Sequence, residues 1–312
     1  MNNDITVSIL MPAYNHEKYI SQAIESVLAQ KTNYPYELLI HDDCSADSTL
    51  TIAQDYATKY PDKIKLFTEK ENQGLMKSYK RLIEQSKGKY LAILESDDYW
   101  LDKNKLQIQI DFLENNPDYG IVAGDIITID DEGNEIKKGG FNSDKASTDF
   151  WYTKLLGLSG FEGACAIIFR RDLFNTYCNI NDYIDLGFKT FDHPTWLSIS
   201  YHSKCKVIPR ILAAYRHTST SLSNNTLFEK HIDFILNIIE IEKYIIEKYG
   251  LNGITQNEYN NRISFIIMGK ALKFHKLKLF CEYAKKLKPI SIKQKFMHFF
   301  PHLYYWQFII RH

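Results

Sequence analysis

Short apolar runs alternate with amphipathic stretches along the first part of the chain. The apolar runs have the length of buried strands and span 7–11, 37–40, 64–67 and 90–94. Apolar residues at helical spacing follow the first three runs, over roughly 17–30, 48–60 and 75–85. Strands and helices that alternate in this way are typical of a mostly parallel sheet with helices on both faces. We therefore predict an α/β fold with a doubly wound, mostly parallel sheet.

Further elements follow beyond residue 100. The pattern predicts a helix over 105–113, a strand over 120–129, a turn at 130–134 and a last strand over 209–215. The turn is acidic, but its spacing fits no calcium loop, so we interpret it as a plain turn. Asp192 and Pro194 indicate a helix start, with Asp192 as the N-cap and Pro194 in the first turn.

Beyond about residue 223 the pattern is helical. We expect one domain over 1–222 and a helical, basic and aromatic C-terminal region over 223–312. The formal net charge of the whole chain is zero, yet residues 271–312 carry nine Lys and Arg and a single acid, Glu282. A basic tail therefore follows an acidic body.

The five cysteines are scattered and form no CxxC pair. Such a set fits a reducing cytoplasm better than a disulfide scaffold. The N-terminus lacks the pattern of a signal peptide, and no apolar run reaches the roughly 18 residues of a membrane-spanning helix. We expect a cytoplasmic protein.

Polar residues follow the predicted strands in four segments. These segments are Pro12-Ala13-Tyr14-Asn15, His41-Asp42-Asp43, Asn72-Gln73-Gly74 and Glu95-Ser96-Asp97-Asp98. In open α/β sheets, ligands bind beyond the carboxyl ends of the strands, so we expect these segments to meet at one edge. No GxGxxG follows the first strand and no GxxxxGK[ST] occurs, which argues against a dinucleotide site or a P-loop.

Three carboxylates, Glu95, Asp97 and Asp98, fall within four positions. Clustered carboxylates repel one another unless a cation joins them, and Mg²⁺ or Mn²⁺ prefers such oxygen ligands. The alternative is a solvated turn with helix-capping acids, although Tyr99 and Trp100 beside it favour a site. Asp42 and Asp43 have the same two interpretations, a helix cap or a contact to a base or ribose.

Four segments together resemble family 2 glycosyltransferases of the GT-A fold, a Rossmann-like sheet. They are VSILMPAYN at 7–15, IHDDCSADST at 40–49, Asn72-x-Gly74, and GKYLA at 88–92 followed by ESDD. The resemblance covers roughly residues 5–222. It implies a metal-dependent, inverting transfer of a sugar from a nucleotide-sugar, with UDP the usual nucleotide, to a hydroxyl of a glycan or lipid-linked acceptor. It also implies a place in bacterial surface-polysaccharide synthesis.

The resemblance assigns roles to several residues. Asp42 would bind the base, Glu95 would face the ribose in place of the commoner Asp, and Asp97 with Asp98 would hold Mn²⁺ or Mg²⁺. The remaining nucleotide contacts would come from Pro12, Ala13, Tyr14, Asn15, Asp43, Asn72, Gly74, Lys77 and Ser96.

The general base of the family matches Asp192, although the preceding acid is missing. His217 would be a further metal ligand, but it stands one position early. A frequent arginine is replaced by Tyr79, so that Lys77, Lys80 or Arg81 would supply its charge.

Two alternatives remain. One is a degenerate member that binds nucleotide or glycan without turnover. The other is a nucleotidyltransferase, which would need a basic glycine-rich loop after the first strand.

Basic residues interleave with aromatics over 273–310, a composition that suits the surface of an anionic membrane. The same residues could instead pack as an ordinary helical appendage or bury in a homodimer. Nothing besides charge suggests nucleic acid, so we expect none as a partner.

Overall fold

The computed structural model describes residues 5–139, 151–157, 163–218, 227–289 and 291–311. The chain divides into two compact units. The first comprises Met1–Trp151 and Phe161–Ser219, and the second comprises Tyr152–Gly160 and Thr220–His312. Each unit is described by itself.

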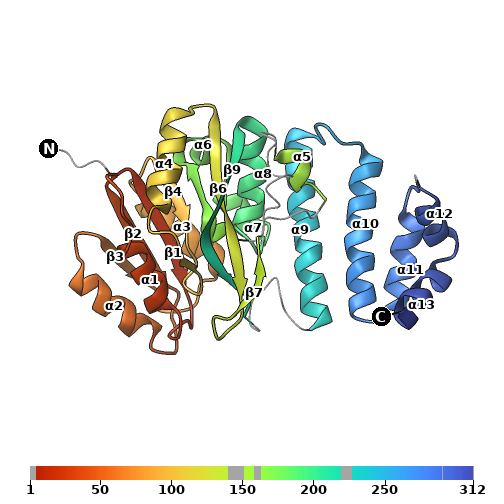
Figure 1. The fold of residues 1–312 in the computed structure, drawn as a ribbon, viewed down its shortest axis with the longest axis horizontal. Coiled ribbons are helices and arrows are strands. Elements are labelled where there is room, and N and C mark those ends of the chain that lie inside the picture. Colours follow the sequence, from red (N-terminus) through yellow and green to blue (C-terminus); the bar gives the residue numbers. More distant parts are fainter. Residues whose placement is uncertain (1–4, 140–150, 158–162, 219–226, 290, 312) are drawn as a thin grey trace. The chain divides into compact units, whose positions relative to one another are not determined.

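The first unit is built on one mixed sheet, whose strands follow the order β3–β2–β1–β4–β8–β6–β9–β5, with β7 paired to β6 (Figure 1). The strands are β1 (Val7–Ala13), β2 (Tyr36–Asp42), β3 (Ile64–Thr68), β4 (Tyr90–Ile93), β5 (Tyr99–Trp100), β6 (Tyr119–Ile129), β7 (Glu135–Lys138), β8 (Ile167–Arg170) and β9 (Lys204–Arg216). Neighbours among β3, β2, β1 and β4 are parallel, and so are β6 and β9. β8 runs antiparallel between β4 and β6.

Helices cover both faces of this sheet. They are α1 (Ile20–Leu28), α2 (Thr49–Lys59), α3 (Leu75–Gln85), α4 (Lys105–Asn115), α6 (Arg171–Tyr177), α7 (Ile180–Asp185) and α8 (Asp192–His202), with a 3₁₀ turn at Ala164–Ala166. Apolar side chains of α1, α2 and α4 form one core with Ile9, Leu38 and Ala92. α3 packs against β1 and β2, and Trp196 of α8 meets Phe169 of β8 edge to face.

Successive residues of a strand point to opposite faces, so a strand buried on both sides reads as a continuous apolar run. Ile9 lies in the core described above, and the next residue, Leu10, is equally inaccessible. The same holds for Leu38 and Leu39. The predicted doubly wound, mostly parallel α/β fold is confirmed.

Several element ends differ from the prediction. β1 continues through Pro12 to Ala13, and β2 continues to Asp42, because the two strands stay in register to these positions. Pro12 lacks an N–H but its carbonyl still accepts one, from Ser96. The last strand, β9, begins at Lys204 rather than near residue 209. Its first residues pair with the start of β6, from Tyr119 onward.

The acidic segment 130–134 is the turn between β6 and β7. Asp130 accepts the backbone N–H of Asn134 through Oδ1 at 2.7 Å and its side-chain amide through Oδ2 at 3.0 Å. These bonds close the turn, which agrees with the plain turn predicted from the sequence.

The second unit is helical. Its helices are α5 (Tyr152–Leu155), α9 (Phe228–Tyr249), α10 (Gln256–Lys273), α11 (Leu277–Lys286), α12 (Ile292–Phe299) and α13 (Pro301–Arg311). Met268, Phe280 and Tyr305 belong to a core that joins α10, α11, α12 and α13. None of the helices in the described residues is both long and apolar enough to cross a bilayer.

A short stretch around α5 is fastened into this second unit. The backbone N–H of Gly157 donates to both carboxylate oxygens of the buried Glu242, at 3.0 and 3.1 Å. The Arg262 guanidinium donates to the carbonyls of Thr153 and Leu156. Tyr152 donates to the carbonyl of Gly250.

Candidate active site

The segments that follow β1 and β2 are tied to each other. Asn15 has a left-handed backbone (φ 55°), and its side-chain oxygen accepts the N–H of Ala46 at 2.8 Å. Its own N–H donates to Oγ of Ser45 at 3.0 Å. Tyr14, by contrast, is 46% exposed and Ala13 is buried. Asn15 therefore ties the segment after β1 to the segment after β2, while the exposed Tyr14 side chain can contact a ligand.

Asp42 is the last residue of β2, Asp43 follows it, and both are buried. Asp43 accepts the N–H groups of Gln73 and Gly74, each at 2.7 Å, and thereby fixes the start of α3. Asp42 accepts the N–H of Ser45 at 3.1 Å through Oδ2. Its other oxygen, Oδ1, has no partner among the residues that the structure describes.

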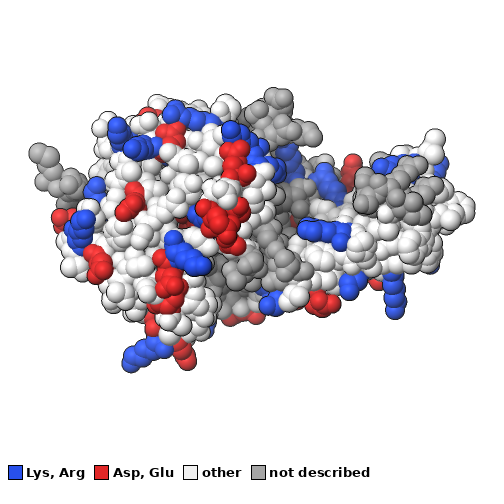
Figure 2. All heavy atoms as spheres, turned by 60° about the horizontal axis from the view of Figure 1, so that its bottom comes forward, with Lys and Arg blue, Asp and Glu red and all other residues white. Residues whose placement is uncertain are grey.

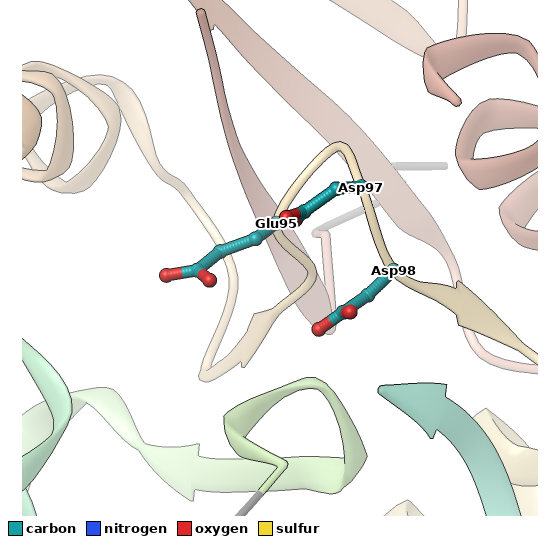
Figure 3. A group of neighbouring side chains, drawn as sticks. All are labelled: Glu95, Asp97 and Asp98. Carbon is teal, nitrogen blue, oxygen red and sulfur yellow. The ribbon is translucent and has the colours of Figure 1, made fainter. Parts of the chain in front are cut away.

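The three clustered acids lie in the loop between β4 and β5 (Figure 3). The chain leaves β4 alongside β1, since Leu94 and Ser96 donate to the carbonyls of Leu10 and Pro12. One carboxylate oxygen from each of Glu95, Asp97 and Asp98 lies within 4.8 Å of the others. This is the donor set that a hard divalent cation requires.

The electrostatics of this loop are those of crowded like charges. Burial, together with the charges of Asp97 and Asp192, raises the pKa of Glu95 to about 8. Burial and the charges of Asp97 and Glu95 raise the pKa of Asp98 well above its usual range. A cation bound among these oxygens would favour their ionised forms and reverse both shifts.

Asp192 follows Phe191, whose ring stacks on Tyr79, the residue that donates to Glu95 of this cluster. It is the first residue of α8, and Phe191 is the N-cap, so the predicted N-cap is wrong by one position. The Asp192 carboxylate accepts the N–H of His193 at 2.7 Å and the hydroxyl of Thr190. Those partners replace the capping bond to the third helical residue. A carboxylate in the first turn also interacts favourably with the helix dipole.

Arg216 and His16 hold the acidic loop in place. The backbone N–H of Arg216 donates to Oδ1 of Asp98 at 2.7 Å, and its Nε donates to the carbonyl of Asp97 at 2.9 Å. The guanidinium also reaches the carbonyls of Asp130 and Asp131. His16 contacts Oγ of Ser96 at 2.8 Å, and its Nε2 lies 3.9 Å from Oδ2 of Asp97.

Other predicted residues lie differently. His217 is outside the carboxylate group just described; its N–H donates to Ile129 and its ring meets Tyr215 edge to face. Lys77 and Lys80 donate to Gln73 and Asn181, respectively, at 3.1 and 2.8 Å.

Arg81 stacks over the ring of Phe67. Each of the three cations considered as substitutes for the missing arginine therefore has a partner outside the acidic loop. Asn72 is exposed beside Gly74, whose positive φ of 87° marks the N-cap of α3.

Sequence reasoning missed three residues that shape the site: His16, Tyr79 and Arg216. Tyr79 donates to Oε1 of Glu95 at 3.0 Å. His16 and Arg216 have their partners 80 and 118 residues away, at Ser96 and Asp98, and only the proximity of His16 to Asn15 gave a local signal.

Comparison with known proteins extends these observations. An uncharacterized protein of Mycobacterium tuberculosis is 35% identical over 127 residues, which are 41% of this chain and 37% of that protein. The chain thus spans well under half the length of this relative. WfgD of Escherichia coli, a UDP-Glc:α-D-GlcNAc-diphosphoundecaprenol β-1,3-glucosyltransferase, is 32% identical over 230 residues, 73% of this chain and 83% of WfgD.

Solved structures show the same fold. The crystal structure of S. aureus TarS 1–349 in complex with UDP-GlcNAc superposes with a TM-score of 0.58 at 16% identity, covering 91% of this chain and 82% of that one. The family described as Glycosyl transferase family 2 matches residues 8–177. This match covers more than half of the chain, and the chain belongs to glycosyltransferase family 2.

Proposed function

We propose that this protein is a metal-dependent, inverting glycosyltransferase. It transfers a sugar from a UDP-sugar to a hydroxyl of a glycan or lipid-linked acceptor in the synthesis of a bacterial surface polysaccharide. The observation that carries the proposal is the group of Glu95, Asp97 and Asp98 at the carboxyl edge of the parallel strands, which Tyr79 and Phe191 connect to Asp192.

Asp42 is the proposed contact to the base. A buried polar atom without a partner is uncommon in folded proteins, and Oδ1 of Asp42 has none among the residues that the structure describes. Uracil has an N–H group that can donate a hydrogen bond to such an oxygen. Ala13 and the exposed Tyr14 lie on the adjoining strand end, where they can line the base. Asp43 acts indirectly, because both of its oxygens already hold the start of α3.

The carboxylate group fits a divalent cation in its chemistry and spacing. Asp97 and Asp98 would hold Mn²⁺ or Mg²⁺, and Glu95 would face the ribose within the same group. Bound there, the ion supplies positive charge against the donor's diphosphate. His217 is not part of this assignment.

Asp192 is the proposed general base. It takes the proton of the acceptor hydroxyl while the hydroxyl oxygen bonds to the anomeric carbon. The bond from that carbon to the diphosphate oxygen breaks, and the diphosphate leaves with the electron pair on the opposite side. The configuration at the anomeric carbon therefore inverts. Hydrogen bonds from the Thr190 hydroxyl and the His193 N–H orient the Asp192 carboxylate.

The acceptor class is proposed from similarity and from the tail. WfgD, which aligns over most of both chains, is named for transfer from UDP-Glc to a diphosphoundecaprenol-linked sugar. An acceptor of this class is held at a membrane surface, so the transferase must work there.

We also propose that α12 and α13 contact that surface. Ile292, Phe299, Phe300, Leu303 and Trp306 are each at least half exposed. Lys285, Lys288, Lys293 and Lys295 are exposed on the same part of the chain. Blue Lys and Arg side chains are spread over the helical unit on the face drawn in Figure 2. Exposed aromatic and basic residues together suit an anionic bilayer.

Calorimetric binding of UDP, GDP, CDP and dTDP, with and without Mn²⁺, tests the proposal. We expect UDP to bind in preference to the other three, and Mn²⁺ to tighten its binding. Preference for another nucleotide would overturn the base assignment. A folded protein that binds none of the four would overturn the proposed transferase.

A further inference from the structure

Tyr79 occupies a central position between two parts of the site. It lies on α3 and is 1% exposed. Its hydroxyl donates to Oε1 of Glu95 at 3.0 Å. Its ring stacks on Phe191, with centroids 4.3 Å apart and planes inclined by 17°. Phe191 directly precedes Asp192.

The hydroxyl and the ring have separate consequences. The hydrogen bond from the hydroxyl fixes which way the Glu95 side chain points. The ring acts on the other neighbour. Phe191 is buried between Tyr79 and Phe174, whose ring centroid is 5.7 Å away.

The packing of Phe191 sets where α8 begins. Its carbonyl accepts the hydroxyl of Thr195 at 2.7 Å, so that the first turn of the helix is bonded to it. A shift of the Phe191 ring would therefore move Asp192 with it. Stacked aromatic pairs contribute roughly 0.5–1.5 kcal/mol beyond their burial and have defined geometry.

The helix that carries Tyr79 is itself anchored at the nucleotide side. α3 starts at Gly74, whose N–H is held by Asp43, the neighbour of Asp42. Lys80, one residue beyond Tyr79, donates to Asn181 of α7 at 2.8 Å. α3 is thus fixed at both ends of the segment that presents Tyr79.

We propose that Tyr79 is a positioning residue that sets Glu95 through its hydroxyl and Asp192 through its ring. It connects the group that faces the donor with the group that activates the acceptor. This inference deepens the proposed function and rests on it.

Three variants separate the two roles. Tyr79→Phe removes the hydroxyl and keeps the stack, and Tyr79→Leu removes both. Tyr56→Phe is the matched control, because Tyr56 of α2 likewise donates to a glutamate, Oε1 of Glu25 in α1 at 2.7 Å, in an exposed hydrogen bond. The measurements are kcat, the donor KM, and the calorimetric Kd of UDP in Mn²⁺.

We expect Tyr79→Phe to raise the donor KM and the UDP Kd about tenfold, with kcat changed less than about threefold. Tyr79→Leu should in addition lower kcat by about tenfold or more, because Asp192 loses its support. Tyr56→Phe should change none of the three. If Tyr79→Leu does not fold, Phe191→Leu replaces it and should lower kcat while the donor KM stays unchanged.

An unchanged KM and Kd in Tyr79→Phe, with an active wild type, overturns the role of the hydroxyl. Equal kcat in the Phe and Leu variants overturns the role of the ring. A wild type that neither binds a nucleoside diphosphate nor turns over a donor overturns the proposed function first, and this inference with it.

Discussion

Asp42 and Asp43 are adjacent, equally buried and opposite in their bonding. Both oxygens of Asp43 accept backbone N–H groups, whereas Oδ1 of Asp42 accepts none from the described residues. The Asp43 carboxylate therefore stabilises the fold, whereas Asp42 keeps an oxygen that can accept a hydrogen bond from a ligand.

Substitution of these two acids should separate binding from stability. We expect Asp42→Asn to weaken UDP binding about tenfold and to leave the melting temperature unchanged or higher. Asp43→Asn should instead lower the free energy of unfolding by about 1–3 kcal/mol, because a backbone N–H at the start of α3 loses its acceptor. Calorimetry and thermal melts measure both. Equal loss of UDP binding in the two variants, at equal stability, would contradict the assignment.

Asp192→Asn should abolish turnover without loss of the donor site. The amide cannot accept the acceptor's proton, so kcat should fall by roughly 10²–10⁴-fold. The Kd of UDP should stay within about threefold of wild type, since the variant keeps the size and hydrogen-bonding oxygen of the side chain. Near-normal turnover in this variant would place the base elsewhere.

Chelation of the metal ion and substitution of Asp97 should both weaken UDP binding, and to the same extent. We expect chelation by EDTA to weaken UDP binding in wild type and to change nothing further in Asp97→Asn. Asp118→Asn is the control, because Asp118 pairs with Lys204 at 2.7 Å on the surface. A Mn²⁺ dependence that survives in Asp97→Asn would exclude Asp97 as a ligand.

The buried Lys105 should make the free energy of unfolding depend on pH. It is fully buried over the ring of Trp100, and its Nζ has no hydrogen-bond partner in the described part of the chain. Burial lowers the pKa of Lys105 to about 7, from 10.5 in an exposed lysine. Between these values the unfolded chain holds a proton that the folded protein lacks, so this lysine makes stability rise with pH over that window.

Lys105→Met removes this dependence. We expect it to raise the free energy of unfolding most below pH 7, where the wild type must bury an ammonium group. The advantage over wild type should shrink as the pH approaches 10. Denaturant unfolding at pH 6 and pH 9 measures the difference, and an advantage that is the same at both would refute the buried charge.

The tail should bind anionic vesicles. We expect co-sedimentation with vesicles rich in phosphatidylglycerol, little with pure phosphatidylcholine, and loss at high salt. The double variant Leu303→Glu/Trp306→Glu should abolish it. Leu236→Glu, at an exposed leucine of α9, is the control. A concentration-dependent dimer that disappears in the double variant, without vesicle binding, would identify the surface as a homodimer contact instead.

The fold was predictable because its strands are apolar on both faces and its helices are amphipathic. Asp42, Asp43, Glu95, Asp97 and Asp98 were also predictable as site candidates, since they lie at or soon after the ends of β2 and β4. Asp192 follows no strand, and only the family resemblance pointed to it. The bonds that position these acids were not predictable. Tyr79 meets Phe191, and Arg216 meets Asp97, across more than a hundred residues, and no local pattern encodes such a pairing.

Asp43 is a further residue whose role the sequence left open. Its sequence context allowed a helix cap or a ligand contact, and only the two bonds to Gln73 and Gly74 decide between them. Likewise, Asp192 was predicted as the N-cap of α8, whereas Phe191 is the N-cap and the Asp192 carboxylate accepts the hydroxyl of Thr190.

The stretch around α5 belongs to the second unit, although it lies between two segments of the first unit in the sequence. Its backbone groups are satisfied by Glu242, Gly250 and Arg262, all of which come long after the last strand of the sheet. Shortening the gene after residue 222 would leave these amides and carbonyls without their partners, and Tyr152 and Leu155 without their cover. Anyone who wishes to isolate the sheet-bearing half must therefore redesign an internal excursion, and cannot simply cut off an end.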